Sequence, residues 1–297
     1  MSKKRSKVQN WMEYLLFKTF FGLVKLMPFS LGCWVGEQLT VLAFYLLYRR
    51  RQLTIENIRL ARANGYLTTQ ESDYRLALNA WKHLGRVSSE FLYFYSHDLK
   101  LLKDAVTIEG RENLDRALAK QKGVILIMAH IGNWELLGSS LALAGYDLCP
   151  LVKKQSNELV DKVIEAKRRS VGMRVVSRTG FLRPVIAALK RNGIVPFLMD
   201  QAVTSKGVSV EFFGRQAWFP RGPAEFALKT ETPALFAYLI RENSNRYRLI
   251  IAEEIDLTHS GNYQNDLAEA TSRFSILIQA AIEQYPEQWL WMHKLWR

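Results

Sequence analysis

A histidine and a glutamate, His130 and Glu135, are the residues of this chain whose types and spacing best suit catalysis. They follow the apolar run 123–129 (GVILIMA), which predicts a strand buried on both faces. Gly132 permits a tight turn, and Asn133 can cap a helix that begins there. His130 is therefore expected at the carboxyl end of a strand, where α/β sheets gather their ligand sites.

The turn decides whether these two side chains can meet. On one continuous helix, residues five positions apart point about 140° from each other, onto different faces. With a turn between them, the carboxylate of Glu135 can fold back onto the imidazole of His130. It would then fix the tautomer and stabilise the imidazolium, while the other ring nitrogen takes a proton from a hydroxyl. The alternative is that His130 only caps the helix and Glu135 only favours its dipole.

The N-terminus is basic and then strongly apolar, which predicts attachment to a membrane. Residues 2–7 (SKKRSK) precede two apolar stretches, 11–29 and 31–48, and Pro28 divides these into two expected helices. The second stretch has a single charge, Glu37, and lies at the lower limit of length for a membrane span. No small-residue cleavage site follows the first stretch, which argues against a signal peptide.

Both flanks of the apolar region are positively charged, because Arg49, Arg50 and Arg51 follow it. The positive-inside rule then places both ends in the cytoplasm. An in-plane or re-entrant hairpin satisfies this rule, and so does a hairpin of two spans, whereas a single span does not. A pair of buried core helices is the remaining alternative. We expect residues 1–50 to form a membrane-anchoring helical hairpin and residues 51–297 to form one α/β domain.

The rest of the chain alternates between strand and helix patterns. After helices at 52–65 and 69–96, strands are expected at 106–108, 123–129, 148–152, near 175 and at 194–199, with helices at 113–120, 135–144, 157–170 and 181–191. Further strands are expected at 208–213, 234–241 and 247–253, the last two as a hairpin, before a helix at 264–284. This order predicts an α/β fold with a mixed, largely parallel central sheet flanked by helices.

Composition narrows the possible partners. The 41 Lys+Arg exceed the 28 Asp+Glu, and the net charge of +13 favours polyanions such as an anionic membrane surface. A nucleic-acid partner is not expected, because the basic residues are scattered and no recognition element accompanies them. Cys33 and Cys149, the only cysteines, suit buried positions and form no disulfide framework or zinc spacing. No cluster has metal-ligand spacing, so no metal is expected.

The segment from His130 to Glu135 (HIGNWE) resembles the H-x4-D/E motif of the glycerolipid acyltransferase superfamily. Its H-x-x-N-W-E form is similar to the bacterial lipid A biosynthesis acyltransferases, which add secondary lauroyl or myristoyl chains. The resemblance extends over nearly the whole chain. It includes Arg49-Arg-Arg with Asn57-Ile-Arg-Leu, Asp200-Gln201, Phe219-Pro-Arg-Gly-Pro223 and the tail from Tyr285 to His293.

The resemblance implies transfer of a fatty acyl chain from an acyl carrier protein thioester to a hydroxyl of a Kdo-bearing lipid A precursor. His130 would deprotonate that hydroxyl, and Glu135 would orient His130. The expected partners are acyl carrier protein, an anionic lipid acceptor and the membrane, with no nucleic acid. No cofactor is expected beyond the acyl donor, for which coenzyme A is the alternative. The expected location is the cytoplasmic face of the cell inner membrane.

Four further residues are candidates for binding the substrate or the oxyanion. The resemblance places a family arginine at Arg168, with Arg169 as the alternative register. Asp200 ends a core strand beside the expected site, and Lys153 follows a strand at the same edge, where phosphate or phosphopantetheine could meet it. Arg221 precedes a helix N-terminus, a natural anion site. A structural or solvated charge is the alternative for each.

Two other functions stay open on the sequence. The first is acyl transfer to a different lipid, a lysophospholipid or a glycolipid, by the same mechanism. Glu135 in place of aspartate, together with Asn133-Trp134, favours lipid A over these acceptors. The second is a non-catalytic lipid-binding membrane protein, against which the intact pair of His130 and Glu135 argues. His293, within an aromatic tail, is expected to pack rather than to react.

Overall fold

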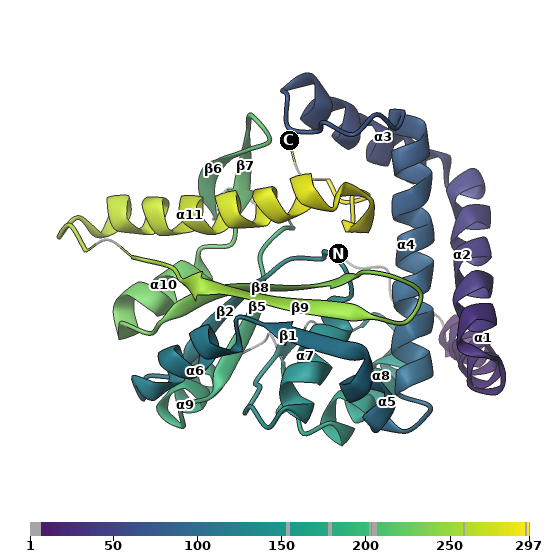
Figure 1. The fold of residues 1–297 in the computed structure, drawn as a ribbon, viewed down its shortest axis with the longest axis horizontal. Helices are drawn as coiled ribbons and strands as arrows, with labels where there is room; N and C mark the ends of the chain where they lie inside the picture. Colours follow the sequence, from purple (N-terminus) through teal and green to yellow (C-terminus); the bar gives the residue numbers. More distant parts are fainter. Residues whose placement is uncertain are drawn as a thin grey trace.

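A five-stranded sheet forms the centre of the computed structural model, which describes residues 7–152, 155–177, 180–201, 203, 207–257, 259–294 and 296 (Figure 1). Its strands, in spatial order, are β1 (Val106–Glu109), β9 (Tyr247–Glu254), β8 (Ala234–Arg241), β2 (Val124–Met128) and β5 (Ile194–Leu198). All neighbours are parallel except β8 and β9, which form the expected hairpin. The predicted mixed, largely parallel sheet is confirmed.

Strand β2 is buried on both faces, as its unbroken apolar sequence predicts. Ile125 and Ile127 face a core shared with α10 (Gly222–Thr230) and α11 (Tyr263–Gln284). The alternate side chains, which include Leu126, face a second core under α6 (Arg111–Ala119) and α7 (Trp134–Leu143). Figure 1 shows α11 on one side of the sheet and α6 and α7 on the other. Helix α9 (Leu182–Lys190) packs beside β5 at the sheet edge.

Several expected strands lie outside the central sheet. Strands β3 (Leu151–Val152) and β4 (Val176–Ser177) are short and pair with each other, joined by α8 (Glu158–Ser170). Strand β6 (Val208–Phe212) pairs with β7 (Arg215–Phe219) as a separate hairpin. One face of this hairpin is buried and the other is exposed, the usual arrangement of an antiparallel pair. Helix α5 (Leu99–Ala105) and β7 are further elements that the sequence patterns did not predict.

Helix α4 (Asp73–Phe94) runs along the side of the domain, with α3 (Tyr48–Ala63) across one end of it (Figure 1). Outside α4 lie α1 (Lys7–Leu26) and α2 (Phe29–Leu46), which are separated at Pro28 as predicted. Among the described residues, Phe29–Leu46 is the one helix whose length and composition would allow it to cross a membrane. Length and composition alone are weak grounds for a span.

Helix α2 is docked on α4 through two glycines. A Cβ on Gly85 would lie 2.1 Å from the carbonyl oxygen of Gly36, and a Cβ on Gly36 would lie 2.6 Å from the carbonyl oxygen of Gly85. Beside this contact Arg86 Nη1 lies 3.2 Å from Glu37 Oε1, so an ion pair joins the same two helices. The polypeptide backbones therefore touch, and α2 is tied to the α/β domain along one of its faces.

The outward faces of α1 and α2 are apolar. Most of the large apolar side chains that are exposed in the described residues lie in this part of the chain. They are Val8, Trp11, Met12, Leu15, Leu16, Leu23, Leu26, Leu31, Trp34, Leu39, Leu42, Tyr45, Leu46, Leu47 and Tyr48. We call this set the apolar platform. So large an unpartnered apolar surface indicates a contact with lipid or protein.

Replacing Gly85 by alanine should destabilise the protein by about 1–3 kcal/mol, the usual cost of overpacking a close contact. The added methyl group would meet the backbone of Gly36, which cannot move aside without shifting α2. Gly22→Ala is the matched control, since nothing lies within 4 Å of its added Cβ. Alanine should stabilise α1 there by up to about 1 kcal/mol. Thermal unfolding of the wild type and of each variant measures these effects. A Gly85→Ala protein with the melting temperature of the wild type would contradict the backbone contact.

Candidate active site

His130 and Asp200 follow the neighbouring parallel strands β2 and β5, so their side chains meet at one edge of the sheet. His130 Nδ1 lies 2.8 Å from Asp200 Oδ1, and the backbone N–H of His130 donates to Oδ2 over 2.8 Å. The indole Nε1–H of Trp289 donates to the same Oδ2 over 2.8 Å. With three hydrogen bonds, the buried carboxylate of Asp200 has its charge compensated and its orientation fixed.

The shared hydrogen bond sets the protonation of both groups. Burial raises the pKa of Asp200, but the charge of His130 and the bonds from His130 and Trp289 outweigh burial, so this pKa lies below its usual value. Burial lowers the pKa of His130, yet the adjacent Asp200 carboxylate prevails and the pKa lies above its usual value. Neutral His130 then carries its hydrogen on Nδ1 and leaves Nε2 free to accept a proton.

The structure corrects the predicted pairing of His130 with Glu135. No hydrogen bond joins these two side chains, both of which are described. Glu135 instead accepts two hydrogen bonds from Arg168, from Nε to Oε2 at 3.1 Å and from Nη2 to Oε1 at 2.5 Å. The reason is geometric, because Asp200 on the next strand fills the Nδ1 side of His130. A guanidinium meanwhile offers Glu135 a two-bonded, charge-assisted partner.

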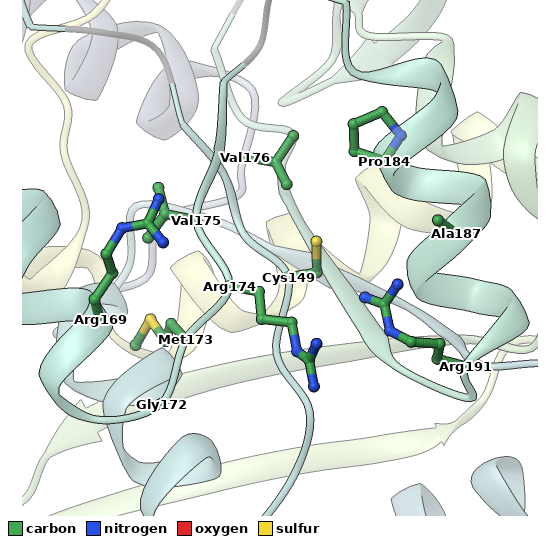
Figure 2. A pocket seen from close by; sticks show the side chains of 10 residues that line it. All are labelled: Cys149, Arg169, Gly172, Met173, Arg174, Val175, Val176, Pro184, Ala187 and Arg191. Carbon is green, nitrogen blue, oxygen red and sulfur yellow. The ribbon is translucent and has the colours of Figure 1, made fainter.

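Arg168 therefore belongs to this site, whereas Arg169 does not. Arg169 forms an ion pair with Glu165 on its own helix at 2.7 Å. Figure 2 shows Arg169, Arg174 and Arg191 among the side chains that line a separate hollow. The volume of this hollow is about 340 Å³. Apart from Arg169, the alternative register for the family arginine, its lining includes none of the predicted site residues.

The backbone turn after His130 is held tightly from both sides. Gly132 has a φ of +57°, and a Cβ on it would lie 1.7 Å from the carbonyl oxygen of Leu239, so only glycine fits. Its N–H donates to the carbonyl of Gln288 over 2.8 Å, and the N–H of Asn133 donates to Leu239 over 2.9 Å. The side chain of Asn133 accepts from the N–H of Leu136 and so caps α7 as predicted.

A buried ionic cluster of Glu90, Arg241 and His83 binds the turn. The carboxylate of Glu90, with an exposed fraction of 0%, accepts from Arg241 Nη2 at 3.0 Å and from Asn133 Nδ2 at 2.9 Å. Arg241 Nη1 also lies 3.2 Å from His83 Nδ1, and His83 Nε2 lies 3.0 Å from the carbonyl oxygen of Gly132. Burial and then the charge of Arg241 keep the pKa of His83 well below its usual value. Neutral His83 thus accepts from Arg241 and donates to Gly132.

Two residues at the site were not recognised from the sequence as functional. Gln201 Nε2 lies 3.2 Å from His130 Nε2 and 3.0 Å from His293 Nε2. Gln201 directly follows Asp200, so its position at the end of a core strand was the signal that could have identified it. His293 was expected to pack rather than to react, and the structure adds that the tail carries its ring to Gln201, beside His130.

The C-terminal tail is fixed in this position by the helix that follows the apolar platform. Asn57 of α3 donates from Nδ2 to the carbonyl oxygens of Trp291 at 2.7 Å and His293 at 2.8 Å. The N–H of Leu290 donates to the carbonyl oxygen of His130 over 3.2 Å. Helix α3 thus holds the tail that contacts the turn at His130.

An apolar groove of about 420 Å³ begins at Trp134 and Glu135, next to the catalytic turn. Its walls come from α1, α2, α4 and α8, and the lining side chains are mostly apolar. They include Phe17, Phe20, Leu39, Leu84, Val87, Phe91, Leu92 and Ile164. A groove of this size and character is suited to a hydrocarbon chain.

Arg221 and Lys153 are the remaining residues that were predicted to belong to the site. Arg221 binds Glu225 Oε1 at 2.9 Å on α10, and no hydrogen bond or ion pair among the described residues links it to the catalytic pair. Lys153 lies outside the described residues. Within the described part of the chain, no group of three or more histidine, cysteine, aspartate or glutamate residues could hold a metal ion.

Comparison with known proteins identifies the family. The family model of the bacterial lipid A biosynthesis acyltransferases matches residues 1–297. The chain belongs to this family. It is an O-acyltransferase that acts on a lipid acceptor.

The names of two relatives give different lipid acceptors. The chain is 25% identical over 284 residues to the lipid A biosynthesis palmitoleoyltransferase of Escherichia coli (strain K12), covering 93% of this chain and 90% of that protein. It is 26% identical over 193 residues to a phosphatidylinositol mannoside acyltransferase of Mycobacterium tuberculosis (strain CDC 1551 / Oshkosh), covering 64% of this chain and 59% of that protein.

Replacing Asp200 by asparagine in this acyltransferase should lower turnover and shift its pH dependence. The raised pKa of His130 predicts that the wild-type rate increases with pH through a midpoint above about 6.5, as the imidazolium loses its proton. Without the carboxylate, burial prevails and the midpoint should move to lower pH. Rates measured from about pH 5 to about pH 9 test this. Asp115→Asn, at an exposed position, is the control. An Asp200→Asn protein with the pH midpoint of the wild type would contradict the pairing of His130 with Asp200.

Proposed function

We propose that this enzyme transfers a fatty acyl chain from an acyl carrier protein thioester to a hydroxyl of a Kdo-bearing lipid A precursor. The observation that carries the proposal is a histidine, 13% exposed and oriented by Asp200, whose ring contacts Trp134 in the lining of an apolar groove. Membership of the lipid A acyltransferase family supports the lipid A acceptor. No cofactor is invoked, because general-base chemistry needs only the two substrates.

His130 acts as the base in this proposal. As the acceptor oxygen attacks the thioester carbonyl, its proton moves to His130 Nε2, and Asp200 stabilises the imidazolium. The tetrahedral intermediate then collapses, the C–S bond breaks, and the proton passes from His130 to the departing thiolate. Because a lipid hydroxyl is a weak acid, this assistance is worth about 10² to 10⁴ in rate.

Glu135 takes a different role from the one first expected, whereas Arg168 keeps its expected role. Their side chains are 22% and 15% exposed, and the paired hydrogen bonds hold the guanidinium against Glu135, which lines the groove. We propose that Arg168 stabilises the oxyanion or an anionic part of a substrate and that Glu135 positions it. Lys153 and Arg221 stay predictions as further contacts for anionic groups, and Asp200 is reassigned from substrate binding to orienting His130.

The apolar platform supports attachment to the cytoplasmic face of the inner membrane, in the plane of the bilayer. If α2 crossed the bilayer while still docked on α4, it would carry the ion pair of Glu37 and Arg86 and the nearby Glu90 towards the hydrocarbon, which is costly. Lying flat, α1 and α2 can bury their outward faces in lipid and keep α4 within the protein. The groove lined by both helices would then take its acyl chain from the membrane side.

Charged substitutions on the platform should release the protein from membranes. Leu16 and Leu26 are 71% and 83% exposed, so Leu16→Glu with Leu26→Glu should leave the fold intact while removing apolar burial in lipid. The fraction that pellets with membranes should fall, whereas high salt should release little of the wild type. Leu101→Glu, at a site 45% exposed on α5, is the matched control. Undiminished pelleting of the double variant would place the attachment elsewhere.

The reaction itself is tested with the full-length protein in detergent micelles, an acyl carrier protein thioester and a Kdo-bearing lipid A precursor. Mass spectrometry should detect one added acyl chain per acceptor, and His130→Ala should lower the rate at least about 10²-fold. Glu135→Ala should also lower it, through Arg168. Near wild-type transfer by a folded His130→Ala protein would refute the assigned base.

A second acceptor is tested in the same assay. The named activity of the mycobacterial relative favours a mannosylated phosphatidylinositol as an alternative glycolipid. A lysophospholipid is the third acceptor to compare, and the coenzyme A thioester is the second donor. Preference for either alternative lipid would assign a different acceptor to the same catalytic site.

A further inference from the structure

We infer that Gln201, held by His293, covers the catalytic nitrogen of His130 until a lipid hydroxyl displaces it, and thereby limits hydrolysis of the acyl thioester by water. The inference rests on the proposed function, because it assigns a gate to the base of that reaction. It concerns specificity for the acceptor, lipid hydroxyl over water, rather than the transfer step itself.

Both hydrogens of the Gln201 amide have an acceptor in this arrangement. A side-chain amide NH₂ has two hydrogens, and its nitrogen lies 3.2 Å from His130 Nε2 and 3.0 Å from His293 Nε2. Each hydrogen can therefore be donated to one imidazole. His130 is available as an acceptor because its own hydrogen is on Nδ1, bound to Asp200.

His293 is suited to hold the amide in place. Burial, followed by the charge of His130, lowers the pKa of His293, so its ring stays neutral and can accept a hydrogen bond. Asn57 fixes the carbonyl oxygens of Trp291 and His293, so the backbone that bears this ring is anchored. Gln201 itself is anchored by its neighbour Asp200, which is buried and bound to His130 and Trp289.

Hydrolysis would use the same base as transfer. A water oxygen attacks the thioester carbonyl, its proton moves to His130 Nε2, and the C–S bond breaks. The proton then passes to the thiolate, which yields a fatty acid and a free thiol. Water bound at His130 Nε2 before the acceptor arrives would thus hydrolyse the acyl donor. The amide of Gln201 occupies that position.

A lipid hydroxyl can open this gate at little cost. When it takes the place of the amide at His130, Gln201 keeps its hydrogen bond to His293 and loses only one partner. A net hydrogen bond of this kind corresponds to about a twofold to tenfold change in how often the nitrogen is uncovered. An acceptor positioned by its own binding contacts meets this requirement, whereas a single water molecule has no such contacts.

Thiol release from a dodecanoyl thioester, measured without any lipid acceptor, tests the gate. The probes are dodecanoyl-coenzyme A and the dodecanoyl thioester of acyl carrier protein, with the full-length protein in detergent micelles. Gln201→Ala should raise the rate of thiol release about twofold to tenfold, because His130 Nε2 is then uncovered. The matched control is Gln216→Ala on the exposed β6–β7 hairpin, which should leave the rate unchanged.

His293→Phe distinguishes a gate from a structural role. Phenylalanine keeps a ring in the aromatic tail but accepts no hydrogen bond from Gln201. Thiol release should rise less than in Gln201→Ala, because the amide retains His130 as a partner, and the double variant should match Gln201→Ala alone. A structural role would instead lower thiol release and acyl transfer together.

The inference is overturned if a folded Gln201→Ala protein releases thiol no faster than the wild type. Failure of the proposed function gives a different result, in which the wild type transfers no acyl chain to any lipid. The comparison of thiol release among variants can still be made in that case, so the two failures are distinguishable.

Discussion

The hydrogen bond between His130 and Asp200 is the interaction on which the rest of the active site depends. It exists because β2 and β5 are parallel neighbours, so the two residues that follow them emerge side by side. Asp200 fixes the imidazole in the tautomer that leaves Nε2 as the acceptor. Since this carboxylate serves His130, Glu135 is free to bind Arg168. Two carboxylates at one site thus orient two different groups, the imidazole of His130 and the guanidinium of Arg168.

Two sets of contacts fix the conformation of the turn from His130 to Asn133. From beneath, the ionic cluster of Glu90, Arg241 and His83 binds both the capping Asn133 and the carbonyl of Gly132. On the other side, the C-terminal tail bonds to the turn and supplies Trp289 and His293. Buried ion pairs add little to stability on balance, but a fully bonded cluster favours one arrangement. Here that arrangement is the one that places His130 against Asp200.

The N-terminal helices that carry the apolar platform are also connected to the candidate active site. Helix α2 touches α4 at its glycines, and α4 contributes His83 and Glu90 to the support of the turn. Helix α3 follows the apolar platform and ties down the tail through Asn57. The groove beside Glu135 is built from α1, α2 and α4 together. The apolar N-terminus is therefore part of the architecture around the candidate active site as well as the surface proposed to contact lipid.

Local sequence patterns were sufficient to predict several features of this protein. Periodicity and turn chemistry predicted the apolar run before His130, the turn at Gly132, the cap at Asn133 and the β8–β9 hairpin, because each depends on neighbouring residues. The binding of His130 by Asp200 rather than Glu135, and the approach of His293 to the site, could be seen only in the folded chain. Those choices depend on which strands are adjacent and where the tail docks. Both are long-range contacts, set by packing of the whole chain, that no local spacing encodes.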